Sequence, residues 1–223
     1  VLIAKIQYLH HIKGVGYEDM TVLTFTNKAA DEIKSRLLAA EPDLPADKLR
    51  GFGTFHSTAL YYLREFLPVE NLGYTKEFLV IDPEEELELA YDLIRQYKLK
   101  IKYKNRLKKR LESAMAVREE EKRVSKYQDD IFKLAGLLGE EKAKQDKMTF
   151  FDLLENANFL LKEEKQKSVS PKWVIVDEVQ DSDTQQLVFM DLLISRGASL
   201  FAVGDPNQVI YSWRGSAFQI FYT

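Results

Sequence analysis

Two adjacent carboxylates, Asp177 and Glu178, directly follow the apolar run Val174–Val176. A short apolar run is typical of a buried parallel strand, and α/β proteins bind their ligands at the carboxyl ends of such strands. There Asp177 could hold Mg²⁺, directly or through its water shell, and Glu178 could accept a proton from an attacking water. The alternative is a strand that ends in solvated acids, which is less expected for an Asp-Glu pair followed by Gln180 and Asp181. The pattern favours a nucleotide-hydrolysing site.

A second apolar stretch with a glycine turn, Ala202-Val203-Gly204, leads to Gln208. An amide at this neighbouring strand end could sense the γ-phosphate of a nucleotide. Tyr211 and Trp213 follow beside Arg214, and aromatic rings next to an arginine are a common means of holding single-stranded bases, at about 1–3 kcal/mol per stacked base. Packing of both rings into the core is an equally good interpretation, and the sequence leaves the two open.

Two further segments, 24–28 and 53–57, each join an expected strand to an expected helix. Hydroxyl groups and free backbone N–H groups at a helix N-terminus can bind phosphate by donating hydrogen bonds to its oxygen atoms. Two such junctions in succession could therefore bind two phosphates of one nucleic-acid strand. Phe25 is an aromatic side chain in the first of these segments. The simpler interpretation is ordinary helix capping, which does not exclude phosphate contact.

A β-sheet is needed to position these polar residues. The pattern of apolar residues predicts alternating strands and helices at both ends of the chain. Thr26 and Asn27 are expected to start one helix, Ser57 to cap another, and Asp183 or Ser182 to cap a third. Asp82 followed by Pro83 predicts a further helix start. The predicted strands are 20–25, 52–55, 174–176 and 199–203, and the predicted helices include 1–13, 26–37, 57–67, 149–161 and 183–194.

Between the two ends lies a highly charged and mainly helical block. Residues 98–110 contain eight Lys and Arg residues, which could form a solvated helical face or rest on duplex phosphates. Residues 78–81 read as a short strand or an extended connection. The chain is therefore predicted to be an α/β domain formed by residues 1–67 and 148–223, interrupted by a helical subdomain at 68–147.

Composition narrows the possible classes of protein. The 223 residues include no Cys and three His, which excludes disulfides and Cys-based zinc sites and fits a cytoplasmic protein. The net charge of −3 means that any nucleic-acid binding must be local. No segment approaches the roughly 20 apolar residues of a membrane span, so no membrane partner is expected.

Five segments together resemble the UvrD/Rep/PcrA-type superfamily 1 DNA helicases. They are TFTNKAADEIKSRL (24–37), GTFHS (53–57), FFDLL (150–154), VIVDEVQD (174–181) and VGDPNQVIYSWRG (203–215). The resemblance implies a RecA-like P-loop NTPase sheet, the first motor domain of such a helicase, with an inserted helical subdomain. It also implies an ATP- and Mg²⁺-dependent enzyme that moves 3′-to-5′ on single-stranded DNA, acts at single-strand/duplex junctions and serves DNA repair.

The resemblance assigns roles to individual residues. Asp177 would bind Mg²⁺, Glu178 would be the catalytic base, Gln208 would contact the γ-phosphate and Arg214 would link the DNA track to the nucleotide site. The remaining DNA-binding residues implied by the resemblance are Phe25, Tyr211 and Trp213, which would stack on bases, and Thr26, Asn27, Thr54 and His56, which would line the track.

The chain departs from the family pattern in lacking the phosphate-binding GxxxxGK[ST] loop and a second motor domain. We therefore expect a piece of the first motor domain that has no ATPase activity by itself; activity above that of a Glu178→Gln control would contradict this. Three alternatives stay open: a degenerate helicase-like module that binds DNA or protein, the motor part of a RecB- or AddA-like helicase–nuclease, and a protein in which residues 98–147 mediate oligomerisation.

Overall fold

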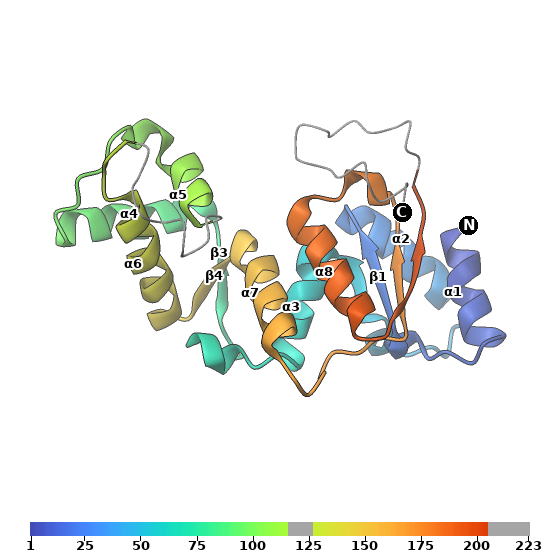
Figure 1. Ribbon diagram of the computed structural model, residues 1–223. Coiled ribbons are helices and arrows are strands. Elements are labelled where there is room, and N and C mark those ends of the chain that lie inside the picture. Colours follow the sequence, from blue (N-terminus) through green and yellow to red (C-terminus); the bar gives the residue numbers. More distant parts are fainter. Residues whose placement is uncertain (116–126, 205–223) are drawn as a thin grey trace. The chain divides into compact units, whose positions relative to one another are not determined.

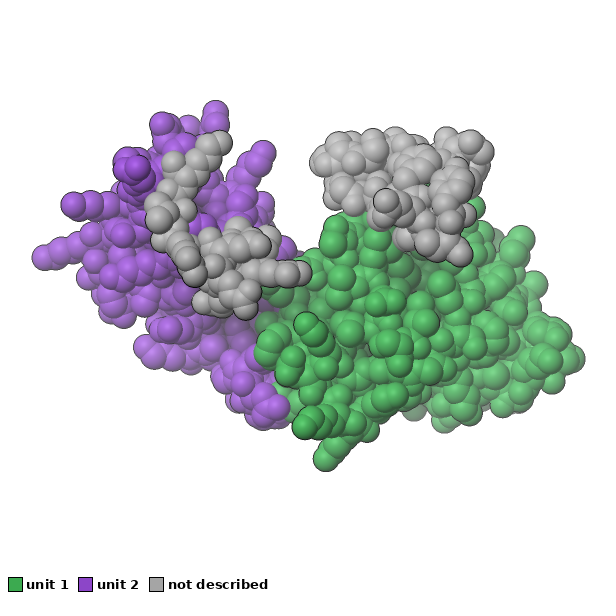
Figure 2. Space-filling model, in the orientation of Figure 1, with its two compact units in different colours: residues 1–68, 153–223 green, residues 69–152 purple. Residues whose placement is uncertain are grey.

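The computed structural model describes residues 1–115 and 127–204, and it divides the chain into two compact units. Unit 1 comprises residues 1–68 and 153–223, and unit 2 comprises residues 69–152 (Figure 2). Gln208, Tyr211, Trp213 and Arg214 lie outside the described residues, so their predicted roles stay predictions.

Unit 1 is built on a parallel four-stranded sheet in the order β2-β1-β5-β6. The pairing sets Val22 opposite both Phe52 and Ile175, and Val174 opposite Leu200. All five residues of β1 are buried, as expected for a parallel strand covered on both faces. The predicted α/β class with a parallel sheet is confirmed. The strands are β1 (Met20–Thr24), β2 (Phe52–Thr54), β5 (Trp173–Val176) and β6 (Ser199–Ala202).

Helices cover both faces of this sheet (Figure 1). On one face Ile6 of α1 and Leu37 of α2 pack with Val22 in a single apolar cluster. Side chains alternate along a strand, so the neighbouring Thr21 points to the other face, where its hydroxyl group hydrogen-bonds Tyr62 of α3. The helices are α1 (Leu2–His11), α2 (Asn27–Ala40), α3 (Phe55–Glu65), α7 (Phe150–Glu163) and α8 (Thr184–Ser195).

Unit 2 contains three helices in its described part and a two-stranded parallel sheet that the sequence only half indicated. The strands are β3 (Leu79–Ile81) and β4 (Lys147–Thr149), and the helices are α4 (Pro83–Gln96), α5 (Leu107–Met115) and α6 (Ile131–Lys144). Val80 pairs with Met148. A mainly helical block was expected from the sequence and β4 was not anticipated, because the three residues Lys147, Met148 and Thr149 carry almost no local strand signal. Because β4 pairs with β3, this unit extends to residue 152.

Helix starts follow side-chain capping. Asp82 Oδ1 accepts a hydrogen bond from the backbone N–H of Glu85 at 2.9 Å, and Asp183 forms a full capping box with Gln186. The expectation that Ser57 caps α3 was wrong. The cap is Thr54, whose Oγ1 accepts from the backbone N–H of Ser57 at 3.2 Å, because the helix starts at Phe55, directly after β2.

Short 3₁₀ turns connect several of these elements: η1 (Tyr17–Asp19), η2 (Ala46–Leu49), η3 (Val69–Leu72), η4 (Lys104–Arg106) and η6 (Val179–Asp181). Within residues 1–115 and 127–204, no helix combines the length and the apolar character needed to cross a membrane.

Candidate active site

The four strands of unit 1 are parallel, so their carboxyl ends meet at one edge of the sheet. The chain leaves β1 at Phe25, β2 at Phe55, β5 at Asp177 and β6 at Val203. The structure thereby brings seven of the predicted site residues to this edge: Phe25, Thr26, Asn27, Thr54, His56, Asp177 and Glu178. Among the described residues at this edge, two adjacent carboxylates follow β5 alone, and β5 lies between β1 and β6.

The turn after β5 is held on both sides by backbone hydrogen bonds. The N–H of Asp177 donates to the carbonyl of Leu23 at 3.1 Å, and the N–H of Val179 donates to the carbonyl of Val203 at 3.0 Å. Between them Glu178 adopts the left-handed conformation, with φ 52° and ψ 43°. A non-glycine residue in this region costs about 1–3 kcal/mol, and such residues cluster at functional sites.

The two carboxylates differ in environment. Asp177 is half-buried, whereas Glu178 is exposed. Burial raises the pKa of Asp177 above its ordinary value, and the nearby charge of Glu178 raises that pKa further. The ionised form of Asp177 is therefore disfavoured, and a cation placed beside it would relieve that cost.

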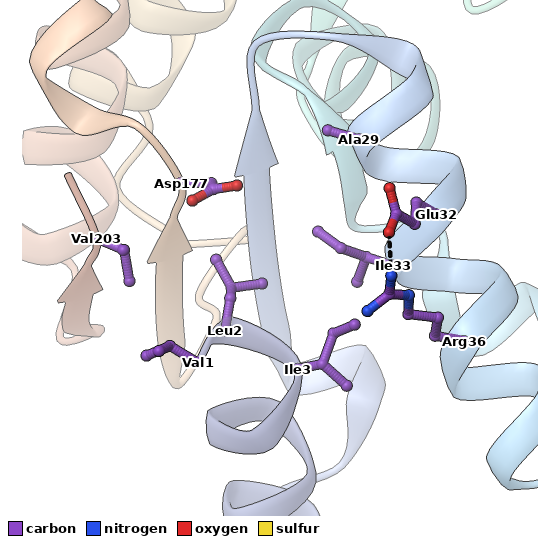
Figure 3. Close-up of a pocket in the computed structure, with 9 residues that line it drawn as sticks. All are labelled: Val1, Leu2, Ile3, Ala29, Glu32, Ile33, Arg36, Asp177 and Val203. Carbon is purple, nitrogen blue, oxygen red and sulfur yellow. Dashed lines mark ion pairs between the residues drawn. The ribbon is translucent and has the colours of Figure 1, made fainter. Parts of the chain in front are cut away.

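A pocket of about 330 Å³ opens next to Asp177 (Figure 3). The N-terminal residues of α1 line it together with Asp177 and with residues of α2, among them the ion pair Glu32–Arg36. The free N–H groups and positive dipole end of a helix N-terminus favour anions. The complete lining is Val1, Leu2, Ile3, Ala29, Glu32, Ile33, Arg36, Asp177 and Val203.

The contribution of α1 and α2 to this pocket was not predicted from the sequence. No local sequence pattern indicates that Glu32 and Arg36 line the pocket, because their position depends on how α2 packs across β1.

The two strand-to-helix junctions lie at the same edge and are both capped by threonine. Thr26 Oγ1 accepts from the N–H of Ala29 at 3.1 Å, and Thr54 caps α3 in the same way. Thr26 and Asn27 are exposed, and Thr54 is half-buried. Both hydroxyl groups therefore serve as caps, as in the simpler interpretation, while the first turns of α2 and α3 begin side by side on adjacent strands.

An aromatic and an imidazole side chain stand at the same junctions. The half-buried ring of Phe25 packs on Phe55, with ring centroids 5.4 Å apart and an interplanar angle of 58°. Burial lowers the pKa of His56, and the charge of Asp183 partly opposes that shift. His56 is therefore mainly neutral at neutral pH, so it can offer a hydrogen bond but no fixed positive charge.

The sequence as a whole matches the family model described as the UvrD/REP helicase N-terminal domain, over residues 1–223. The chain belongs to this family. Relatives of this UvrD-type chain include the ATP-dependent DNA helicase Rep of Salmonella typhimurium, 30% identical over 93% of the chain, and the ATP-dependent DNA helicase PcrA of Staphylococcus aureus, 27% identical over 98%. The ATP-dependent DNA helicase srs2 of Schizosaccharomyces pombe is 28% identical over 97% of the chain.

The UvrD-type chain spans only part of these relatives: 32% of Rep, 31% of PcrA and 27% of srs2. The match covers both units. The predicted family is confirmed by these comparisons, and the RecA-like parallel sheet agrees with it.

Proposed function

We propose that this chain is the first motor domain of an ATP-dependent DNA helicase that couples ATP hydrolysis to 3′-to-5′ movement on single-stranded DNA. The observation that carries the proposal is the pair Asp177–Glu178 at the end of the interior strand β5, where Asp177 lines a pocket together with residues of α1 and α2. The names of the relatives support the same activity, since Rep, PcrA and srs2 are each called ATP-dependent DNA helicases.

The residues present fit a magnesium nucleotide. Asp177 supplies a hard oxygen ligand, and its half-burial beside Glu178 creates an excess of negative charge that a divalent cation would neutralise. When bound, Mg²⁺ would neutralise charge on the phosphates and favour attack at the terminal phosphorus. Glu178 is exposed toward solvent, so a water molecule can reach its carboxylate, and it is proposed to accept the proton of the attacking water.

Single-stranded DNA is proposed to run across the junctions β1–α2 and β2–α3. Thr26, Asn27, Thr54 and His56 offer hydroxyl, amide and imidazole groups there, and Phe25 offers a half-buried ring that packs at a tilt on Phe55. Base stacking on such a ring is tolerant of sequence, which suits a translocating enzyme. Tyr211, Trp213 and Arg214 are proposed to extend this track, and Gln208 to contact the γ-phosphate.

The basic segment 98–110 in unit 2 is proposed to contact duplex phosphates at a single-strand/duplex junction. Its apolar residues Leu99, Ile101 and Leu107 are buried in the core of unit 2. Seven of its eight basic residues are exposed: Lys98, Lys100, Lys102, Lys104, Arg106, Lys108 and Lys109. Apolar residues turned inward and cations turned outward make a surface for an anionic partner.

The decisive experiment measures ATP hydrolysis stimulated by single-stranded DNA in the full-length protein that contains this chain. Glu178→Gln is expected to lower turnover by about 10²–10⁴-fold, the usual contribution of a general base. A loss smaller than tenfold would show that Glu178 is not the base. Phe25→Ala is expected to weaken oligo-dT binding by roughly 5- to 100-fold in fluorescence anisotropy, equivalent to one lost base stack.

The duplex contact is tested separately by salt dependence. The double variant Lys104→Ala/Lys108→Ala is expected to weaken junction binding and to reduce the slope of log K against log salt by roughly 1–2. Lys165→Ala, an exposed lysine of unit 1, serves as the matched control. An unchanged slope in the double variant would remove unit 2 from the proposed DNA contact.

A further inference from the structure

We propose that Gln180 is a positioning residue that holds the carboxylate of Glu178 for proton transfer. The inference rests on the proposed function, because it presumes that Glu178 is the catalytic base. It concerns a residue to which neither the motif pattern nor the family resemblance assigned a role.

A single hydrogen bond connects the two side chains. Nε2 of Gln180 donates to Oε2 of Glu178 at 2.6 Å. A carboxylate only accepts hydrogen bonds, so the amide nitrogen must face it. Glu178 is exposed, whereas Gln180 is only 4% exposed. The buried amide therefore restrains an exposed carboxylate.

The backbone around Gln180 is well fixed, so the amide is a stable support. Gln180 lies in the centre of η6, whose first residue Val179 is 2% exposed and donates its N–H to Val203. The N–H of Asp181 donates a hydrogen bond to the carbonyl of Glu178 at 2.9 Å, and the N–H of Ser182 donates to the carbonyl of Val179 at 3.1 Å. The left-handed turn at Glu178 and the following 3₁₀ turn thus bring residues 178 and 180 face to face.

At its other end, the amide of Gln180 gains no hydrogen bond from the described part of the fold. Its Oε1 is buried and has no hydrogen-bond partner among the residues that the structure describes. An unsatisfied buried acceptor opposes folding. A methionine of similar length would fill the same space without that penalty, so the described part of the fold gives no reason for a glutamine here.

Positioning has a direct consequence for catalysis. A general base acts only within hydrogen-bond reach of the proton that it accepts, and a misplacement of about 1 Å can cost roughly 100-fold in rate. Loss of the Gln180 contact would let the Glu178 side chain sample several rotamers. Turnover should fall, while nucleotide binding, which uses other groups, should not change.

The experiment is a double-mutant cycle on the full-length protein, read out as kcat and KM for ATP with saturating single-stranded DNA. Gln180→Met is expected to lower kcat by about 10–100-fold, with KM for ATP unchanged within roughly twofold. In the Glu178→Gln background the same substitution should have no further effect, because residues that act through one group are not additive. The melting temperature of Gln180→Met should equal or exceed that of the wild type.

Two further variants secure the result. Gln180→Asn keeps an amide but shortens the side chain by one methylene, so it should lose the contact and show the same selective loss of kcat. Gln185→Met is the matched control, because it also removes a glutamine amide, but one that hydrogen-bonds Asn158 and not Glu178. This variant should leave kcat unchanged.

The outcomes separate the two proposals. Additive effects of Gln180→Met and Glu178→Gln, full activity of Gln180→Asn, or a fall in melting temperature that parallels kcat would overturn the positioning role alone. If Glu178→Gln itself retains more than a tenth of wild-type turnover, the proposed function fails, whatever Gln180 does.

Discussion

Lys142 and Asp152 form an ion pair that is almost completely buried in unit 2. The Nζ atom of Lys142 lies 2.8 and 2.6 Å from the two carboxylate oxygens of Asp152, and the two residues are 1% and 6% exposed. Glu86 gives the same ammonium group a second carboxylate at 2.7 Å. Asp152 also accepts the N–H of Thr149 at 2.7 Å, so this cluster joins α6 to the start of α7.

Removing this cation is expected to destabilise the chain strongly. Lys142→Met leaves two carboxylates facing each other without a counter-charge, and breaking one partner of a buried pair typically costs about 3–5 kcal/mol. Urea denaturation followed by circular dichroism measures the change. Lys144→Ala is the control, because Lys144 is 77% exposed and its 3.7 Å pair with Glu141 should contribute under about 0.5 kcal/mol. Equal effects of the two variants would refute the buried cluster.

The left-handed backbone of Glu178 gives a prediction about stability that is independent of catalysis. Glycine adopts this conformation without a Cβ penalty, so Glu178→Gly should be more stable than Glu178→Ala by about 1 kcal/mol. The same pair of substitutions at the exposed residue Asp191, inside α8, should have the opposite order, because glycine weakens a helix interior by about 1 kcal/mol relative to alanine. The melting temperatures of the four variants, measured by thermal unfolding, test both orders of stability.

Asp177 should make stability depend on pH in a defined direction. Its folded pKa is raised above the ordinary value of 3.8, so the folded chain keeps a proton at pH values where the unfolded chain has released it. The stability of the wild type relative to Asp177→Asn should therefore fall as pH rises from below 3.8 through the raised pKa. Chemical denaturation of both proteins between pH 3 and pH 7 measures the difference. A gain of wild-type stability over this range would mean that the pKa is depressed instead.

Capping of α3 is assigned to Thr54, and this assignment can be tested against the neighbouring serine. Thr54→Ala removes the acceptor for the N–H of Ser57 and should cost about 1 kcal/mol, whereas Thr54→Ser should retain most of the stability. Ser57→Ala should cost a few tenths of that amount, because Ser57 occupies the third position of the helix. A larger loss for Ser57→Ala in urea denaturation would restore the serine as the cap.

The strongest agreement between sequence and structure lies in the strands of unit 1 and in two helix starts, one in each unit. Val174–Val176 and Met20–Thr24 are continuous apolar or β-branched runs, which fold as strands wherever both faces of a sheet are covered. Asp82 and Asp183 were recognisable caps because the interaction is local and spans only three residues. These features depend on neighbours in the chain, so the sequence alone was enough to predict them.

The errors came from features with weak local signals. β4 consists of Lys147, Met148 and Thr149 and exists because β3, more than sixty residues earlier, pairs with it. Thr54 and Ser57 are both good caps by residue type, and only the end of β2 decides between them. Strand pairing and element ends are set by tertiary contacts, which override local preference.

Sequence by itself determined the family, the parallel α/β class and the placing of two carboxylates at the end of an interior strand. These features depend on the order of motifs and on apolar runs, which are local properties of the sequence. Tertiary structure alone decided that the N-terminus of α1, the Glu32–Arg36 pair of α2 and Asp177 line one pocket, and that the buried amide of Gln180 faces Glu178. The strand order β2-β1-β5-β6 and the left-handed turn after β5 bring these groups together, and neither follows from any one segment.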